Sequence, residues 1–162
     1  MANILLADAS KCTGCRICEM VCSLEKTGEV RPSDARCRVV REGFEAVAPV
    51  VCQHCEDAPC AAACPVGAIR RDAESGRVLL DADECVGCGE CIPACPFSAI
   101  QRDHEQNVVK CDLCGGDPQC ARFCRSGALS LVPAADAPEA RRRLTTASTG
   151  NPAGKSISGG AT

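Results

Sequence analysis

Residues 85–96 read CVGCGECIPACP, with four cysteines at the spacing C-x2-C-x2-C-x3-C and a proline after the last. This spacing is typical of [4Fe-4S] cluster ligands, and the fourth cysteine of such a run binds a neighbouring cluster. The first three thiolates surround one cube through a tight loop, whereas the fourth begins a helical turn and points away. The proline fixes its own φ and donates no hydrogen bond, so the chain leaves the site in a set direction. The run therefore needs a second motif elsewhere in the chain.

The chain contains three further quartets of cysteines, and each starts with C-x2-C and finishes with C-x3-C. In chain order the quartets are motif one (Cys12, Cys15, Cys18, Cys22), motif two (Cys52, Cys55, Cys60, Cys64), motif three (Cys85, Cys88, Cys91, Cys95) and motif four (Cys111, Cys114, Cys120, Cys124). Zinc and disulfides are the weaker alternatives, because zinc sites normally take two separated pairs and disulfides persist in oxidising compartments. The sequence therefore predicts sixteen cysteine ligands to iron and four [4Fe-4S] clusters.

An internal repeat accompanies the quartets. Residues 8–15 read DASKCTGC and residues 81–88 read DADECVGC, so Gly14 and Gly87 hold the same place in their loops. Glycine is favoured where a backbone must take positive φ or approach a ligand closely. The repeat indicates duplication of one structural unit.

The composition is unusual for a globular core. The chain has 162 residues and 17 cysteines but only three Phe, no Trp and no Tyr. Large aromatic side chains normally fill an interior, and here small residues and inorganic clusters would replace them. We therefore expect that the chain without clusters does not fold, because the free energy of metal binding is then also folding free energy.

Charge and the N-terminus limit the location and the partners. The formal net charge is −3, and four clusters with their thiolates would add about −8. Nucleic acid is therefore an unfavourable partner, because phosphate binding needs a basic surface. The first residues lack the basic and apolar regions of a signal peptide, and no twin-arginine pair precedes Cys12. No apolar run approaches the roughly 18 residues of a membrane span. These features favour the cytoplasm, where thiols stay reduced.

Duplication predicts how the motifs share ligands, since the fourth cysteine of one motif serves the cluster of its partner. Motifs two and three lie close in sequence and both carry the proline, so we expect them to pair, and motif one to pair with motif four. The predicted ligand sets are Cys12, Cys15, Cys18 with Cys124; Cys111, Cys114, Cys120 with Cys22; Cys85, Cys88, Cys91 with Cys64; and Cys52, Cys55, Cys60 with Cys95. Pairing of one with two and three with four remains an alternative.

The expected fold class is α+β, with two ferredoxin-like two-cluster domains built of short strands and short helices within residues 1–132. β-branched runs predict a hairpin in the insert 23–51, where Pro49 restricts its strand to an edge. Two more hairpins are expected between motifs, over 69–80 with its turn at 75–76 and over 99–109. Residues 133–162 form a C-terminal extension rich in Ala, Pro, Ser and Gly, which we expect to bind a partner; residues 137–144 could form two helical turns.

One cysteine, both histidines and one basic run lie outside the quartets. Cys37 is expected to be a small strand residue away from any quartet. His54 is expected to pack near a sulfur or to donate a hydrogen bond that tunes a cluster potential, and His104 to be solvated in a turn. The basic run Arg141–Arg143 suits a partner contact or a solvated helix face equally. No motif of conventional catalysis is present, so no catalytic residue is predicted.

The motifs also carry a resemblance to a known family. Residues 52–60 (CQHCEDAPC), 85–97 (CVGCGECIPACPF) and 110–114 (KCDLC) resemble the four-cluster iron–sulfur subunits of molybdenum or tungsten pterin oxidoreductases, formate hydrogenlyases and carbon monoxide dehydrogenases. The resemblance implies four [4Fe-4S] clusters and the pairing given above, with no [3Fe-4S] variant because motif four is complete. The chain departs from the family at Arg125, where many members have proline.

Two further segments, 13–19 (TGCRICE) and 32–39 (PSDARCRV), are similar to the small subunit of tungsten aldehyde oxidoreductase complexes. The chain is therefore expected to be a non-catalytic subunit that relays electrons from a catalytic oxidoreductase subunit to a second redox protein, such as a flavin subunit. In this relay motif three would be a middle link, with the ends at motifs one and four or at motif two. The alternatives are a free soluble polyferredoxin, or a subunit of a formate dehydrogenase, hydrogenase or CO dehydrogenase complex. Copies of the chain could also stack.

Overall fold

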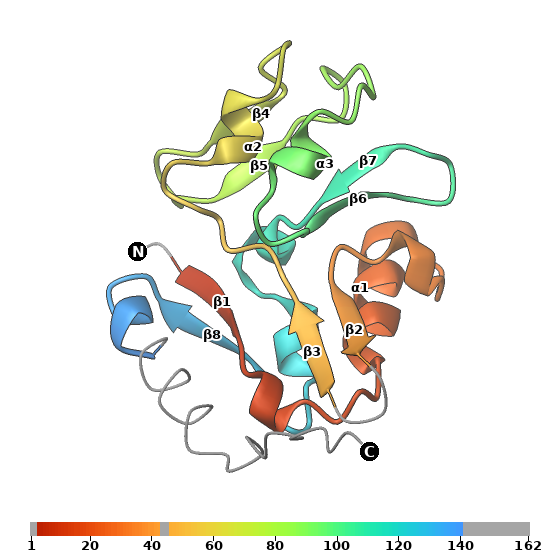
Figure 1. Ribbon diagram of the computed structural model, residues 1–162, viewed down its shortest axis with the longest axis vertical. Helices are drawn as coiled ribbons and strands as arrows, with labels where there is room; N and C mark the ends of the chain where they lie inside the picture. The colour runs from red at the N-terminus through yellow and green to blue at the C-terminus, as the bar shows by residue number, and fades with distance from the viewer. Residues whose placement is uncertain (1–2, 43–45, 141–162) are drawn as a thin grey trace, which may run out of the picture.

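The computed structural model describes residues 3–42 and 46–140. Its strands are short and form four two-stranded antiparallel sheets (Figure 1). The pairs are β1 (Asn3–Ala7) with β8 (Leu129–Pro133), β2 (Arg38–Glu42) with β3 (Ala46–Val50), β4 (Ile69–Arg71) with β5 (Val78–Leu80), and β6 (Ile100–Arg102) with β7 (Val108–Lys110). The predicted α+β class with short strands and short helices is confirmed; the division into two ferredoxin-like domains stays a prediction.

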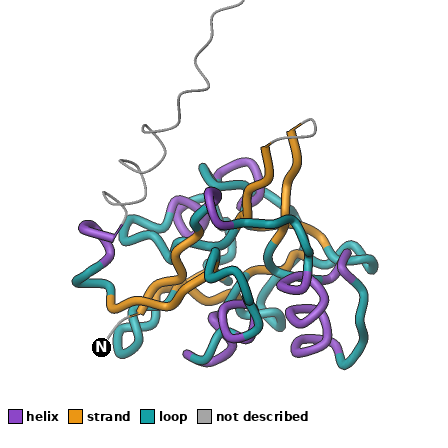
Figure 2. The backbone as a smooth tube through the Cα atoms, turned by 90° about the horizontal axis from the view of Figure 1, so that it is seen from below, coloured by secondary structure: helices purple, strands orange, loops and turns teal. Residues whose placement is uncertain are grey.

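Each cysteine motif includes a helix. Figure 2 shows the helices in purple, connected by loops in teal. The longest, α1 (Ile17–Thr27), ends where Gly28 takes φ +76° and donates to the carbonyl of Leu24, a normal helix ending. This helix begins inside motif one and continues through the first five residues of the predicted insert 23–51. The other helical elements are α2 (Pro59–Ala62), α3 (Cys91–Ala94), α4 (Gln119–Arg122) and the 3-10 turns η1 (Ala9–Lys11), η2 (Pro32–Asp34) and η3 (Leu113–Gly116).

Long-range pairing brings the two ends of the motif region together. In Figure 1, β1 in red lies beside β8 in blue, and α1 packs against α4. Meanwhile α2 packs against α3. Motif one therefore lies next to motif four, and motif two next to motif three.

The two hairpins predicted between motifs are confirmed. In the first, β4 pairs with β5, and Gly76 takes φ +68° while its N–H donates to the Asp72 carbonyl at 2.9 Å. In the second, β6 pairs with β7 and Asp103 accepts hydrogen bonds from the turn. β2 and β3 pair over the β-branched runs of the insert, although residues 43–45 at that turn lie outside the described residues. Because each sheet has two strands, Pro49 does stand on an edge.

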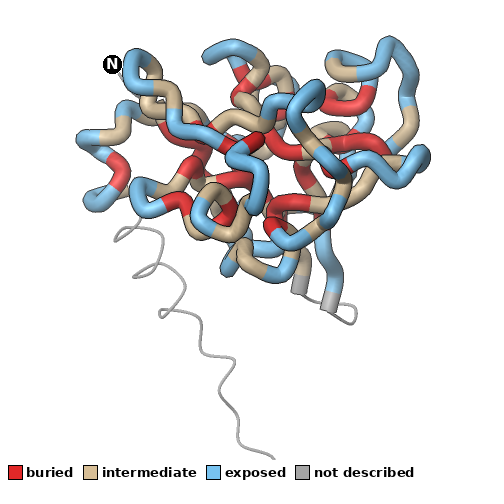
Figure 3. The backbone as a smooth tube through the Cα atoms, turned by 90° about the horizontal axis from the view of Figure 1, so that it is seen from above, coloured by how far each residue is buried: buried red, intermediate tan, exposed pale blue. Residues whose placement is uncertain are grey.

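The interior is built from small aliphatic side chains and thiols, and the buried segments run through the middle of the molecule in Figure 3. The first apolar cluster contains Leu5, Cys22, Ala35, Cys37, Val51, Cys52, Ala99, Cys111, Leu113, Cys120 and Leu129. The second apolar cluster contains Ala58, Cys60, Ile69, Val78, Cys91, Ile100 and Val108. No aromatic side chain belongs to either cluster of the described residues.

The start of the predicted C-terminal extension packs onto the fold. Residues 137–140 are helical, and Ala137 is buried against Ile4 and Leu6 of β1. The predicted partner contact or solvated helix face at Arg141–Arg143, and the second half of the two helical turns expected over 137–144, lie outside the described residues. Within the described ranges, no helix has the length and apolar character needed to cross a membrane.

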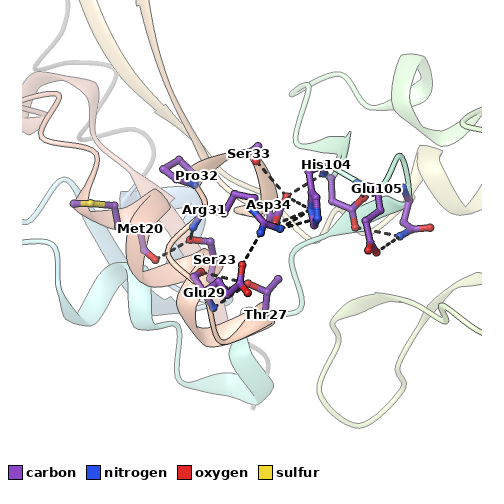
Figure 4. A network of polar contacts seen from close by, with 12 residues as sticks. Met20, Ser23, Thr27, Glu29, Arg31, Pro32, Ser33, Asp34, His104 and Glu105 are labelled. Carbon is purple, nitrogen blue, oxygen red and sulfur yellow. Dashed lines mark hydrogen bonds and ion pairs between the residues drawn. The ribbon is translucent and has the colours of Figure 1, made fainter.

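A polar network fastens the insert to the hairpin after motif three (Figure 4). The Asp34 carboxylate, 1% exposed, lies 3.2 Å from the guanidinium of Arg31 and 2.9 Å from Nδ1 of His104. It also accepts the backbone N–H of His104 at 3.0 Å. The prediction that His104 is merely solvated is wrong, because its ring, although 43% exposed, links two segments that are far apart in sequence.

Candidate cluster-binding sites

One cavity is lined by the cysteines of motif one together with the last cysteine of motif four. Its thiols are Cys12, Cys15, Cys18 and Cys124, and the other lining residues include Ile17 and Leu129. β1 and β8 create this meeting, since motif one follows the first strand and Cys124 precedes the last. Four thiols around an apolar cavity fit the ligand requirement of one [4Fe-4S] cube.

A second cavity repeats this arrangement between motifs two and three. It is lined by Cys52, Cys55, Cys60 and Cys95, with His54 and Lys110 among its other residues. The packing of α2 against α3 brings Cys95 to this place. This set also has four thiols and can accept one cube.

The third group joins motif four to the last cysteine of motif one. Cys22, Cys111 and Cys120 are buried together in the first apolar cluster. Burial raises the pKa of Cys111 and of Cys114, and nearby thiols, Cys22 among them, raise both further. These charge effects indicate that the four sulfurs share one neighbourhood, although a thiolate must form before iron can bind.

Ion pairs hold this third group in place. The Asp112 carboxylate, beside Cys111, lies 2.8 Å from Lys26 of α1 and 3.4 Å from Arg36. Its backbone carbonyl accepts a hydrogen bond from Arg77 at 3.1 Å, which ties the turn between β4 and β5 to the same loop. Motif four is thereby fixed to both motif one and the hairpin after motif two.

The fourth group lies at the far side of the second apolar cluster. Cys91 belongs to that cluster, and Cys64 and Cys85 pack against it. Burial raises the pKa of Cys91, and the charges of Cys60, Cys85 and Cys88 raise it further. Cys64, Cys85 and Cys88 therefore lie around the apolar cluster that contains Cys91.

Backbone N–H groups point at the sulfurs that end the motifs. The N–H of Leu129 donates to Cys124 at 3.3 Å, that of Ala99 to Cys95 at 3.4 Å, and that of Arg36 to Cys22 at 3.2 Å. Such donors stabilise a thiolate, which is the metal-binding form. The aliphatic pairs that follow motifs two, three and four, Ala68-Ile69, Ala99-Ile100 and Ala128-Leu129, are all buried.

The loops have the backbone geometry that the internal repeat predicted. Gly14 takes φ +71° and Gly87 φ +69°, a region that favours glycine. A Cβ at Gly14 would also lie 2.8 Å from Nη2 of Arg41. Both loops therefore need glycine at this place.

The four groups form a line whose order differs from the order of the motifs. Motif one touches motif four through Cys37, which contacts both Cys18 and Cys120. The charge of Cys52 acts on Cys111, and that of Cys60 acts on Cys91. These contacts favour the order motif one, four, two, three, with motif three at one end; that motif three is a middle link stays a prediction. The β1–β8 pairing causes this, because it places motif four between motif one and the rest.

Exposure distinguishes the ends of this line from its middle. Of the cysteines, all of which are described, only Cys15 and Cys88 are exposed. Cys15 belongs to the group at one end and Cys88 to the group at the other. Val86, two residues before Cys88, and Val66, two residues after Cys64, are 65% and 46% exposed, so apolar side chains near the cysteines of this group reach the surface.

The position of Cys37 differs from the one that the sequence predicts. It is buried, and its Sγ donates to the carbonyl of Cys18 at 3.4 Å. Hydrogen bonds with Cys120, Cys18 and Cys22 raise its own pKa, so it remains a thiol that donates. In turn, the hydrogen bond from Cys37 lowers the pKa of Cys22 to about 6, against the opposing effect of burial. The expectation that it is a strand residue away from any quartet is wrong, because it lies in the bend just before β2 and contacts Cys18 of α1.

His54 and Lys110 line the second cavity. Nδ1 of His54 accepts the N–H of Val78 at 3.0 Å, so the ring proton of the neutral imidazole is on Nε2. Burial and the charge of Lys110 lower the pKa of His54 to about 3, which keeps it neutral. The expectation that His54 packs near a sulfur agrees with this position, since its backbone N–H donates to Cys52 at 3.5 Å. In the sequence Lys110 is simply the residue before Cys111, and no sequence pattern there indicates that it is buried.

The residues present fit iron–sulfur clusters better than single metal ions. Among the described residues, no three His, Cys, Asp or Glu side chains gather closely enough to hold one ion. A cube holds its four thiolates further apart, one on each iron, and therefore needs groups of the looser kind described above.

The short-stranded α+β fold and the four groups of thiols define a ferredoxin-type iron–sulfur protein. Residues 43–133 match the 4Fe-4S dicluster domain family, and the chain belongs to this family. The resemblance to four-cluster electron-transfer subunits that the sequence carries is thereby confirmed at the level of the family.

Several relatives are similar over most of their length. The polyferredoxin-like subunit of an aliphatic sulfonate oxidoreductase from Pyrococcus furiosus is 41% identical, over 79% of this chain and 76% of that protein. The putative electron transport protein YsaA of Escherichia coli is 35% identical, over 82% of this chain and 90% of that protein. Formate hydrogenlyase subunit 2 of Escherichia coli is 34% identical, over 88% of each.

Proposed function

We propose that this chain is an electron-transfer subunit that relays single electrons through four [4Fe-4S] clusters between a catalytic oxidoreductase subunit and a second redox protein. The observation that carries the proposal is a pair of cavities, each lined by three thiols of one motif and one of another. The names of the relatives, two of which are subunits of oxidoreductases or of formate hydrogenlyase, support a catalytic partner. When bound, the clusters supply one-electron chemistry over a wide range of potentials.

The proposed ligand sets are those predicted from duplication. The cavities lined by Cys12, Cys15, Cys18, Cys124 and by Cys52, Cys55, Cys60, Cys95 support two of them. The alternative pairing of motif one with two has no comparable support, because Cys64 packs beside motif three and Cys22 beside motif four.

The protein's own residues serve the relay in two ways. Buried thiols and aliphatic side chains exclude water from the two inner groups, whereas exposed Cys15 and Cys88 bring the outer groups to the surface. Electrons would therefore pass between partners at the motif-one end and the motif-three end. The exposed apolar residues Val66 and Val86 suit a protein contact at the second of these.

Ligand variants test the sets. Protein purified without oxygen should contain about sixteen irons per chain. Cys124→Ala and Cys12→Ala should each remove the same EPR signal, whereas Cys114→Ala should remove a different one. If Cys124→Ala instead matched Cys88→Ala, motif three would pair with motif four and the proposed sets would be wrong.

The partner is tested by native purification. As catalytic partner we propose first a tungsten aldehyde oxidoreductase subunit, because of the resemblance at residues 13–19 and 32–39. The chain should elute as part of a larger complex that contains W, Mo or Ni in addition to Fe. Elution as a monomer of 16.8 kDa would contradict the subunit proposal and favour a free polyferredoxin.

A further inference from the structure

Lys110 is a buried lysine at the end of β7. It is 3% exposed, and among the described residues no carboxylate forms an ion pair with it. Its Nζ contacts three atoms: Sγ of Cys52 at 3.3 Å, the carbonyl of Cys111 at 3.3 Å, and the carbonyl of Val78. Burial of a charge without a carboxylate is costly unless another negative group compensates it.

The contacts of Nζ identify its protonation state. Both carbonyls can only accept hydrogen bonds, and a Cys52 sulfur that binds iron can also only accept. Three acceptors need three N–H donors, which an ammonium has and a neutral amine lacks. Lys110 is therefore a cation at the wall of the second cavity.

The required negative group is the cluster proposed for that cavity. A [4Fe-4S]2+ core with four thiolates carries a net charge of about −2, and about −3 after it takes up one electron. A fixed cation in contact with one thiolate stabilises the reduced form more than the oxidised form. Its effect is large here because the site is buried and water screens it little.

Val78 of β5 fixes the position of this cation. Its carbonyl accepts from Nζ of Lys110, and its N–H donates to Nδ1 of His54, which lines the same cavity. The hydrogen bond leaves the Nε2 proton of His54 without a partner in the described structure. The backbone of one residue thus contacts both His54 and Lys110 at this cavity.

We propose that Lys110 is a positioning residue that raises the reduction potential of the cluster bound by Cys52, Cys55, Cys60 and Cys95. The inference rests on the proposed function, because it requires a cluster at this site. In the line of groups this cluster lies directly after the motif-four group, at the crossing between the two pairs of motifs. Electron transfer into it reduces the core by one electron and oxidises the donor cluster by one, with no proton or group transferred. Lys110 makes this step more favourable.

The test compares the holoprotein with three variants by EPR-monitored redox titration. Lys110→Met removes the cation, Lys110→Arg keeps it, and Lys11→Met is the matched control. Lys11 also directly precedes the first cysteine of a motif, but its side chain is 58% exposed and pairs with Asp8. The signal of the motif-two cluster is identified as the one that Cys55→Ala abolishes.

In Lys110→Met the ratio of reduced to oxidised motif-two cluster should fall at least tenfold at a given potential, which is a downward shift of about 59 mV. Lys110→Arg and Lys11→Met should shift it far less. The inference is overturned if Lys110→Met leaves this potential unchanged at full iron content, or if Lys110→Arg shifts it equally.

Iron content and the reduction potential of the motif-two cluster are measured separately. If Lys110→Met does not take up iron, the same titration on Lys110→Gln decides; failure of both to load would overturn the inference and leave Lys110 a structural role. A wild-type protein that lacks about sixteen irons per chain would instead contradict the proposed function.

Discussion

At the scale of the residue, Cys37 lies among ligands without being one of the sixteen that we propose. Each quartet is complete without it, and its thiol donates to the carbonyl of Cys18 while lying among the thiols of Cys18, Cys22 and Cys120. We expect Cys37→Ala to keep all of its iron, about sixteen atoms per chain, whereas Cys22→Ala should lose about four. Iron and acid-labile sulfide analysis of the two purified variants makes the comparison. Loss of four irons in Cys37→Ala would show that Cys37 is a ligand.

Asp34 gives a second prediction at this scale, on pH. Burial by itself would raise the pKa of Asp34, but the hydrogen bonds from the backbone and ring of His104 outweigh burial and lower it below 3.8. A carboxyl whose pKa is lowered on folding stabilises the fold above its ordinary pKa and loses this effect as pH falls through the folded value. Wild type should therefore be more thermostable than Asp34→Asn at pH 7. This difference in Tm should stay the same between pH 7 and pH 8, because the carboxyl is ionised throughout that range, well above 3.8.

Equal Tm values for wild type and Asp34→Asn would mean that the carboxylate charge is not what holds His104. Ser33→Ala is a suitable control, because its hydroxyl contacts the same carboxylate at 3.3 Å but carries no charge. Its Tm should follow wild type at every pH.

At the scale of the element, the β1–β8 pair closes the outer part of the fold. Leu5 of β1 is fully buried in the first apolar cluster and stands opposite Leu131 of β8. Leu5→Ala should lower the free energy of unfolding by about 3 kcal/mol, since it removes buried carbon and leaves a cavity. Leu24→Ala, at a site that is 49% exposed, should change it by less than about 0.5 kcal/mol.

The measurement for both leucine variants is the urea concentration at which the visible absorbance of the clusters is lost. The EPR signals of the motif-one and motif-four clusters should disappear first in Leu5→Ala, because β1 and β8 support these two groups. Simultaneous loss of all signals would instead indicate that the whole region unfolds as one unit.

At the scale of the whole molecule, the order one–four–two–three has a magnetic consequence. Reduced clusters that are neighbours broaden each other's EPR signals. Cys88→Ala should remove this coupling from one remaining cluster, whereas Cys55→Ala should remove it from two. Low-temperature EPR of the fully reduced proteins distinguishes these patterns. If Cys88→Ala affected two clusters, motif three would be a middle link after all.

The sequence predicts the parts of this molecule better than their order. Spacing alone identified the quartets, the glycines at 14 and 87, and the hairpins, because each depends on residues close together in the chain. The place of motif three at one end depends on β1 pairing with β8, which no local pattern reports. The same reason explains why the predicted position of Cys37 is wrong and why the sequence does not indicate the contacts of Lys110. Their partners lie in elements far away in sequence.

The pairing of the first and last strands also bears on how the protein is made. Cys12, Cys15 and Cys18 are synthesised early, but their proposed fourth partner, Cys124, follows more than a hundred residues later. At usual synthesis rates this delay is roughly 5 to 20 s. The proposed site of motif two becomes complete sooner, as soon as Cys95 has emerged. The middle of the nascent chain can therefore be loaded while its beginning still waits for Cys124, so clusters would be inserted from the centre outward.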